Sequence, residues 1–395
     1  MVRLSLEDRR RTIGRSLLQL TNKAWALTAN EKQSLRSLIA EAESLEDDIQ
    51  ANTRRKYARA YSTWLRFGMD GVKPEERSLL REFRDMGTGG QAAGPGATAG
   101  FFVPADFYAK VSSGLAFYGP MFDQNVVTIH DTTTGAPRGY PEDNDTQISG
   151  EQSDENAEVT QEDIQGLSSV VLKAFRYSSK LVKVSIALAQ DTGFDLDAYL
   201  ADRFAIRIAR AANPRLTTGV GTVEPFGVVT QATLGAVANG SSANTGGSET
   251  GGTSIGTGDF AALEASVDFA YRNNGKFMMH PATLSVLRQA NNKIGSSLFP
   301  ELHTAGADTI FGYPVVLNPA MDQLPVNPSS PPATRKTVLF GDFSKYVVRR
   351  VTPIIQRLEE RFIDFGQYSY IMHQRLDGNL IDGSGGAVKY LANIY

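Results

Sequence analysis

Cysteine is absent from this 395-residue chain, and histidine and tryptophan occur only four times and twice. Without cysteine the chain has no disulfide framework, no thiolate metal site and no cysteine nucleophile. The histidines are scattered, so we expect no zinc site and no cofactor. They are His130, His280, His303 and His373.

Long apolar runs are missing as well. No stretch approaches the about 20 apolar residues that cross a membrane as a helix. The first twenty residues contain arginines but no apolar segment of signal-peptide length. A formal net charge of −3 gives no polycation signature for binding duplex DNA. We therefore expect a soluble protein that is made in the cytoplasm.

Recognisable catalytic motifs are also lacking. The glycine-rich residues 86–104 have no Gly-Lys-Ser/Thr ending and no preceding strand, so a linker is favoured over a phosphate loop. There is no Gly-x-Ser-x-Gly elbow. The acidic run at 151–163 lacks the spacing of a calcium loop and indicates a solvated, charged arm. The sequence thus predicts no active site.

The composition changes sharply at the glycine-rich stretch. Residues 1–87 hold 17 Lys/Arg and 13 Asp/Glu, whereas the remaining 308 residues hold 23 and 30, so the net charge goes from +4 to −7. Only one of the 17 prolines, Pro74, lies before the break. Two modules joined by a linker are expected.

The first module is predicted to be helical. A capping box at residues 28–31 starts a helix that carries apolar residues at threes and fours to Ile49. A second helix is expected over 54–67 and a third after Pro74. The apolar stripe is narrow, which favours a coiled coil or a partner helix, although a small helical bundle with no special role stays open.

The second module combines strands and helices. Residues 195–212 predict a long amphipathic helix that ends before Pro214, with acidic residues at its start. Residues 276–280 predict a buried strand, and Pro281 the first position of the next helix. The end of the chain is mostly strand, with a turn at Asp377-Gly378.

Two segments are expected to leave this body. Residues 132–166 are polar and acidic in the middle and alternate at both ends, as a long two-stranded arm does. Residues 235–258 are mostly Gly, Ser and Thr and predict a flexible surface loop.

The order of motifs carries a family resemblance. "AGFFVP" (99–104), "KLVKVSIALAQDTGFDLDAYLADRFAIRIA", "TTGVGTVEPFGVV", "KFMMHPATLSVLRQANNKIGSSLF", "IFGYPVVLNPAMDQLP" and "VLFGDFSKYVV" follow one another. Together they resemble the tailed-phage major capsid proteins of the Hong Kong 97 type. The similarity runs from about Gly100 to Tyr395.

This resemblance implies an α+β Hong Kong 97-like fold behind an α-helical scaffolding segment. The expected parts are a scaffolding segment (1–87), a linker and cleavage region (88–98), an N-terminal arm (99–131), an extended arm (132–170), a peripheral domain (171–215 and 335–375) and an axial domain (216–334 and 376–395).

The resemblance also implies roles for individual residues. Glycines of the linker form the cleavage region, Pro104 begins the shell domain, acidic arm residues contact neighbouring subunits, and Gly341 and Asp342 form a turn. The glycines are Gly87, Gly89, Gly90, Gly94 and Gly96, and the acidic residues are Glu151, Asp154, Glu155 and Glu158. Between Val111 and Leu172 there is no lysine, so the arm is not expected to form the isopeptide cross-link of some family members.

The implied function is self-assembly into hexamers and pentamers of a virion shell around DNA, which is enclosed without sequence-specific contact. Implied partners are further copies of the chain, a portal protein, a maturation protease and decoration proteins. Two alternatives stay open: an encapsulin-like compartment, and an α/β enzyme with a helical regulatory domain.

Overall fold

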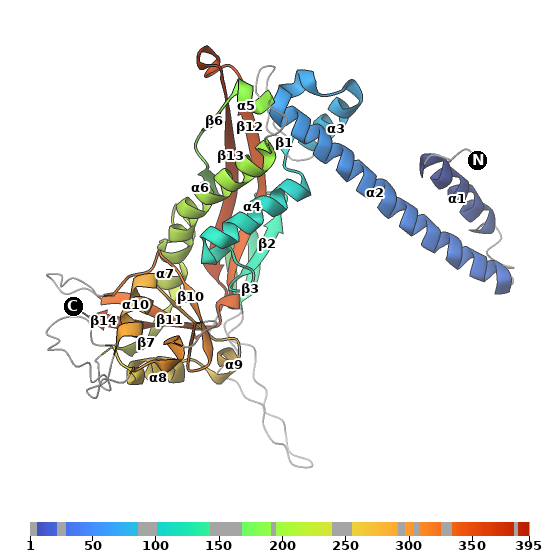
Figure 1. Cartoon of the computed structure of the whole chain (residues 1–395). Coiled ribbons are helices and arrows are strands. Elements are labelled where there is room, and N and C mark those ends of the chain that lie inside the picture. The colour runs from blue at the N-terminus through green and yellow to red at the C-terminus, as the bar shows by residue number, and fades with distance from the viewer. Residues whose placement is uncertain are drawn as a thin grey trace.

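The computed structural model describes residues 6–21, 29–85, 101–142, 168–190, 195–238, 255–290, 297–303, 308–324, 334–382 and 386–394. Figure 1 shows an elongated body made of two sheets with helices, and a helical arm that leaves one end of it. The predicted linker glycines, the acidic residues Glu151, Asp154, Glu155 and Glu158, and most of the Gly/Ser/Thr loop lie outside the described residues.

The first sheet is built on two long antiparallel strands, β12 (Tyr346–Leu358) and β13 (Gln367–Leu380). Shorter strands extend it: β1 (Phe101–Phe102) and β2 (Thr128–Thr132) pair with β12, and β5 (Phe175–Ser178) and β6 (Val182–Ser185) pair with β13. Buried and half-buried residues alternate over residues 352–358 of β12 and 370–376 of β13, because successive side chains point to opposite faces. One face is therefore core and the other more exposed along these stretches, whereas residues 346–351 of β12 are buried on both faces.

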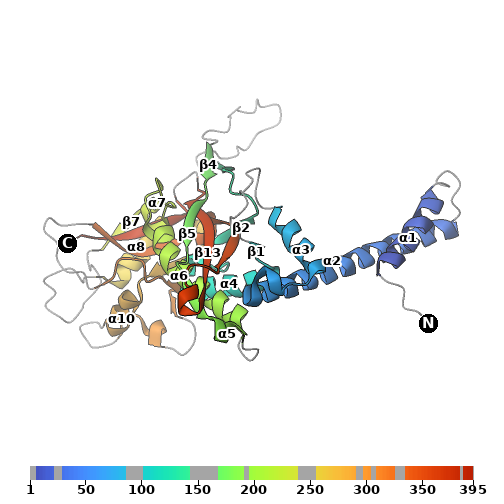
Figure 2. The same ribbon diagram turned by 90° about the horizontal axis from the view of Figure 1, so that it is seen from above.

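Two helices cover the buried face, α4 (Ala105–Tyr118) and α6 (Leu196–Thr218). Seen from above, they lie on one side of the sheet and β4 (Ser168–Leu172) lies on the other (Figure 2). The Asp195 carboxylate caps α6 by accepting from the Ala198 N–H at 3.1 Å. Short helices border this layer: η1 (Pro120–Phe122), α5 (Ile186–Gln190) and α7 (Val228–Gln231).

The prediction that the long helix ends before Pro214 is wrong. α6 runs to Thr218, with Pro214 inside it. Proline removes one helical hydrogen bond. Tertiary contacts hold the last turn nevertheless, because Leu216 and Thr217 are fully buried and the Leu216 carbonyl accepts from the Tyr346 hydroxyl at 3.0 Å.

The second sheet has the strand order β7-β14-β11-β8-β10-β9. Its strands are β7 (Thr233–Val237), β8 (Lys276–Met279), β9 (Thr309–Ile310), β10 (Tyr313–Leu317), β11 (Thr334–Gly341) and β14 (Val388–Ile394). Helices around it are α8 (Thr257–Ser266), α9 (Phe269–Arg272), α10 (Pro281–Gln289), η2 (Pro300–His303) and η3 (Phe343–Lys345). The predicted strand before Pro281 and the helix start at Pro281 are confirmed. The chain passes between the sheets after β11 and after β13, so the expected peripheral stretch 335–375 begins inside the second sheet.

Three buried polar side chains join α6, which covers the first sheet, to the second sheet. The Asn213 side-chain amide donates to Asn318 Oδ1 at 2.9 Å, and the Asn318 amide donates to Thr217 Oγ1 at 2.9 Å. Asn213 and Thr217 lie on α6, while Asn318 follows β10. Because buried amides are costly unless they are paired, this network fixes where the second sheet meets α6.

The Asp377-Gly378 turn is a second wrong prediction. Both residues are buried inside β13, and the two long strands are instead connected through η4 (Ile363–Phe365) and Gly366, whose φ is 62°. A Cβ at Gly378 would lie 2.5 Å from the Tyr346 hydroxyl. Glycine is needed there for close packing, and not for a turn.

The N-terminal helices are α1 (Leu6–Thr21), α2 (Ala29–Gly71) and α3 (Pro74–Asp85). The two separate helices expected between residues 31 and 67 are one, which is interrupted only at Gly68 (φ 76°). α1 folds back along α2, with Arg10 paired to Glu46 at 3.2 Å (Figure 1). No helix in the described part of the chain is long and apolar enough to span a membrane.

The second half of α2 docks on the body. Its buried residues belong to the same apolar cluster as α4, α6 and the first sheet; they are Tyr57, Ala60, Tyr61, Trp64 and Leu65. The Tyr370 hydroxyl of β13 donates to the Leu65 carbonyl at 2.6 Å. This half of the helix is thus part of the core, and only the first half resembles the expected partner helix.

We predict that Trp64→Ala lowers the free energy of unfolding of the whole chain by about 3 kcal/mol, because removal of the large buried side chain leaves a cavity. Urea unfolding followed by circular dichroism measures this loss. The control is Ile39→Ala on the exposed first half of the same helix, where Ile39 is 43% exposed and a change below about 0.5 kcal/mol is expected. Equal effects of the two substitutions would contradict docking of α2.

Candidate assembly site

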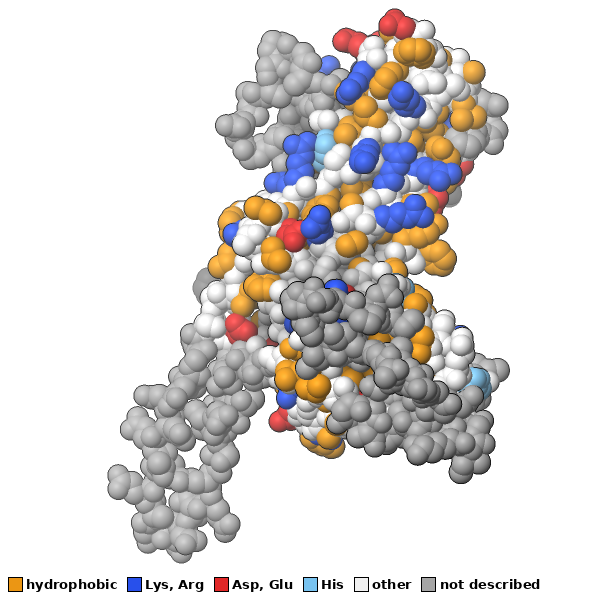
Figure 3. All heavy atoms as spheres, turned by 90° about the vertical axis from the view of Figure 1, so that its left-hand side faces the viewer, with side chains coloured by type: hydrophobic (Ala, Val, Ile, Leu, Met, Phe, Trp, Pro, Cys, Tyr) orange, Lys and Arg blue, Asp and Glu red, His pale blue; other side chains and the backbone are white. Residues whose placement is uncertain are grey.

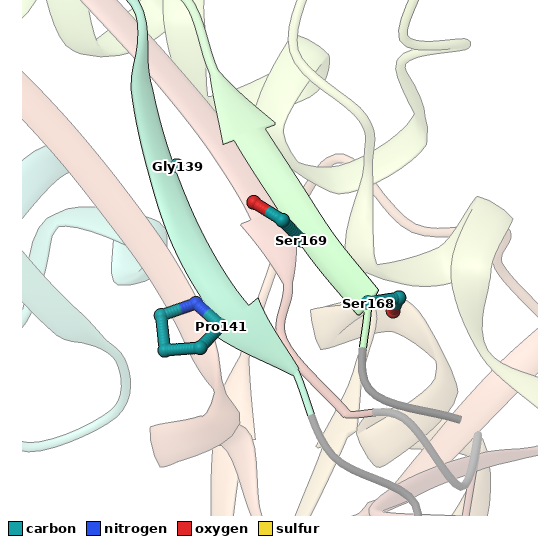
Figure 4. Close-up of a pocket in the computed structure, with 4 residues that line it drawn as sticks. All are labelled: Gly139, Pro141, Ser168 and Ser169. Atoms are coloured by element: carbon teal, nitrogen blue, oxygen red, sulfur yellow. The ribbon is translucent and has the colours of Figure 1, made fainter. Parts of the chain in front are cut away.

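The base of the extended arm is held to the body by several hydrogen bonds from buried side chains. Strands β3 (Arg138–Glu142) and β4 pair antiparallel and lead into and out of residues 143–167. In Figure 4 the Ser169 side chain points towards β3 at Gly139, and a Cβ at Gly139 would lie 2.9 Å from Ser169 Oγ. The predicted two-stranded form is confirmed for these ten residues.

Arg349 holds both ends of this ribbon to the sheet. Its side chain is fully buried and donates to the Thr134 carbonyl at 2.7 Å, where the chain leaves the body. It also donates to the carbonyl of Leu172 at 3.1 Å, where the chain returns. A guanidinium has five donors in a rigid fork, so one side chain can bind both segments. Burial lowers its pKa from the ordinary value.

Asp377 supports the same junction from β13. Its carboxylate accepts from the backbone N–H of Lys173 at 2.5 Å and from that of Gly378 at 2.8 Å. Burial raises the pKa of this carboxyl, and the two N–H donors oppose the rise. The returning leg of the arm is thus fixed on one side by Arg349 and on the other by Asp377.

Arg350, the next residue, binds β2 and α4 on the other face of the sheet. Its guanidinium makes a two-point contact with the Asp131 carboxylate of β2 at 2.9 and 3.0 Å. It also donates to Ser112 Oγ on α4 at 3.1 Å, while the Tyr108 hydroxyl donates to Asp131. Adjacent residues of a strand point to opposite faces. Arg349 and Arg350 therefore link the base of the arm and the helix layer through one strand, β12.

The docking of α2 uses the far end of the same two strands. Burial raises the pKa of Tyr370, the donor to Leu65, to about 12. Arg357 of β12 lies 4.0 Å from the centre of the Tyr368 ring and donates to the Arg66 carbonyl at 3.5 Å. Gly68 has a φ of 76°, which favours glycine at the kink, and a Cβ there would also meet the Arg357 guanidinium.

The other predicted site residues lie at chain junctions. Pro104 occupies the N-cap position of α4. Gly341 ends β11 with a φ of 148°, and a Cβ there would lie 2.0 Å from the Ala387 carbonyl. Asp342 caps η3 by accepting from the Ser344 N–H at 3.0 Å. These three positions shape the chain.

Sequence reasoning missed Arg349 and Arg350. The signal was present, because two arginines interrupt an otherwise apolar strand in "KYVVRRV", and fully buried arginine is rare without partners. The described residues contain no cluster of side chains that could hold a metal ion. The contacts at this junction hold the two legs of the arm in fixed positions on the first sheet.

A family model for the phage capsid family matches residues 99–391. The chain belongs to this family. No curated protein sequence matches it. The match begins at the predicted start of the shell domain, and residues 1–98 precede it.

Solved structures of phage-type capsids share the fold. The capsid protein of an empty GTA particle is 20% identical with a TM-score of 0.54, and the match covers 68% of this chain and 88% of that one. The capsid protein of a native GTA particle is 18% identical with a TM-score of 0.53, covering 82% and 96%. The fold is Hong Kong 97-like, and the chain is a major capsid protein whose copies form an icosahedral shell.

We predict that Arg349→Met destabilises the capsid subunit by about 3 kcal/mol, because several buried acceptors lose their donor. Hydrogen exchange should rise first in the peptides that contain Thr134 and Leu172. Arg349→Lys keeps the charge without the fork and should recover less than half of the loss. Full recovery by lysine, or unchanged exchange at both legs in the methionine variant, would contradict the role of the fork.

Proposed function

We propose that this major capsid protein builds hexamers and pentamers of a phage head around DNA, with residues 1–87 as a fused scaffolding segment. The observation that carries the second part is the division of α2. Its second half is buried in the subunit core, whereas its first half, with α1, leaves the body (Figure 1). Such a segment has one end fixed to a subunit and another free to meet other copies.

The charge of the free half supports this role. Arg54, Arg55 and Lys56 follow Glu46, Asp47 and Asp48 along the helix after five uncharged residues. Unlike charges on neighbouring turns of an exposed helix allow pairing between copies as well as within one. Many weak contacts then add up, because each subunit is held in place by several others.

The other proposed partners follow from the same role. A portal protein would occupy one vertex, a maturation protease would cut the linker 88–98, and decoration proteins would bind the finished shell. The packaged DNA would be enclosed without sequence-specific contact. The chain would be made in the host cytoplasm and end in the virion. We propose no catalytic activity and no cofactor.

Electron microscopy of the purified full-length chain tests the proposal. We predict closed icosahedral shells from the complete chain, and open or irregular assemblies after removal of residues 1–50, which takes away α1 and the free half of α2 and leaves the docked half in the core. Discrete monomers or dimers from the complete chain at every concentration would contradict the shell. Regular shells from the shortened chain would contradict the scaffolding role alone. Shells from infected cells that hold enzymes and no DNA would favour the encapsulin-like alternative.

Removal of the segment is a separate prediction. In mature particles we expect a new N-terminus within residues 88–98, because this stretch is rich in glycine and alanine and joins the N-terminal helices to the shell domain. N-terminal sequencing or intact-mass measurement of the particles decides the point. A subunit that still begins at Met1 or Val2 would show that the scaffold is retained.

A further inference from the structure

The N-terminal helices pack against the body over residues 57–80, which we call the docked segment. Its buried apolar side chains belong to the same cluster as α4, α6 and the first sheet, and each is at most 5% exposed. They are Tyr57, Ala60, Tyr61, Trp64, Leu65, Val72 and Leu80. Among the residues before Tyr57 whose burial is described, the buried apolar side chains are Ile13 and Leu45. The boundary between the free and the docked part of α2 thus lies just before Tyr57.

The body contributes both its helix layer and its long strands to this interface. The Tyr61 ring packs edge-on against Phe107 of α4, with the ring centres 6.1 Å apart. α2 also contacts α5 and α6, and α3 contacts β1. With the Tyr370 hydrogen bond to the Leu65 carbonyl, these contacts are all made by α2 and α3, outside the linker 88–98.

One buried pair at the interface is left without hydrogen bonds. The Tyr61 hydroxyl and Asp197 Oδ1 of α6 are buried, and neither has a partner in the described part of the chain. Burial, together with the charges of Tyr57 and Asp197, raises the pKa of Tyr61 well above its ordinary value. Tyr61 therefore holds the segment through the packing of its ring and not through its hydroxyl.

Loss of the docked segment would uncover apolar surface. On the face of the body turned away from the helical arm, hydrophobic side chains lie among Lys and Arg side chains (Figure 3). Such scattered exposure is normal for a protein in water, whereas a contiguous apolar patch is not. Phe107 and Tyr370 are buried, and they would lose the cover of the segment together. Retention of the segment avoids this exposure.

We propose that the docked segment is a permanent part of the capsid subunit and stays bound to the shell domain after the linker 88–98 is cut. The inference rests on the proposed cleavage and adds the fate of the helical piece. The cut hydrolyses one peptide bond with one water and leaves a carboxylate on the helical piece and an amine on the shell domain. Both new ends lie outside residues 57–80. Loss of the free half then requires a second cut, between residues 50 and 57.

The test is a controlled cut in the full-length chain. A recognition sequence for a site-specific protease replaces part of residues 88–98, and complete cleavage is checked on a denaturing gel. Before the cut the linker keeps the two pieces at a high effective concentration, so retention after it depends on the interface alone. Unassembled subunits at about 1 µM are separated by size exclusion in native buffer. About nine-tenths of the helical piece or more should elute with the shell domain, which corresponds to a Kd of about 10 nM or less.

Two substitutions at Tyr61 show which interface holds the piece. Tyr61→Ala removes the ring that packs on Phe107 and should weaken binding about a hundredfold, so that less than half is retained. Tyr61→Phe removes only a hydroxyl without a partner and should be retained as the unmodified piece is. Ile39→Ala in the free half is a second control. Unfolding temperatures of the uncut variants show whether each is folded, and the unmodified docked segment decides the proposal even where Tyr61→Ala is unfolded.

Elution of the unmodified helical piece apart from a folded shell domain would overturn the proposal. Equal retention of the Tyr61→Ala and Tyr61→Phe pieces by folded subunits would overturn it as well, because the piece would then be held elsewhere.

Mass spectrometry of mature particles gives a second reading. A peptide that covers residues 57–80, beside a shell chain that begins within 88–98, supports the proposal, and such a shell chain without the peptide contradicts it. A subunit that still begins at Met1 or Val2 would show that the proposed cleavage fails, while the controlled cut still decides retention. The two failures are therefore distinguishable.

Discussion

The structure depends on two adjacent arginines in the centre of one strand. Arg349 and Arg350 are fully buried in β12, and each points to a different face of the sheet. Arg350 binds β2 and α4 through Asp131 and Ser112, and Arg349 binds both legs of the extended arm. Because a buried guanidinium without acceptors is very costly, each arginine is tolerated only when the layer that it binds is in place. The strand thereby sets where the arm leaves the subunit.

This constraint explains how the subunit presents its projecting parts for assembly. A shell needs the same contact to form between many copies, so the projecting parts must start from fixed positions. The arm starts from the Arg349 junction, and the N-terminal helices start from the docked half of α2 at the other end of β12 and β13. The long strands act as a rigid frame between the two.

Much of this was predictable from the residues. The composition break, the long helix that starts at Asp195, the buried strand before Pro281 and the two-stranded base of the arm all carry local signals, and the order of motifs indicated the fold. The misses have tertiary causes. Packing against Tyr346 carries α6 past Pro214, and close approach to the same side chain, not a turn, requires Gly378. The docking of α2 was missed because an apolar stripe does not reveal what it packs against. The arginine pair was visible in "VVRRV", but its acceptors lie far away in the sequence. Arg349 binds backbone carbonyls, and Arg350 binds the side chains of Asp131 and Ser112.

The central claim is that the arginine pair fixes the arm so that it reaches a neighbouring subunit. A cryo-electron microscopy reconstruction of assembled shells at side-chain resolution tests it most directly. The account predicts the Arg349 contacts to Thr134 and Leu172 in every subunit, with residues 143–167 continuing onto an adjacent copy. An arm that folds back on its own subunit, or an Arg349 side chain that has released both legs in the shell, would contradict it.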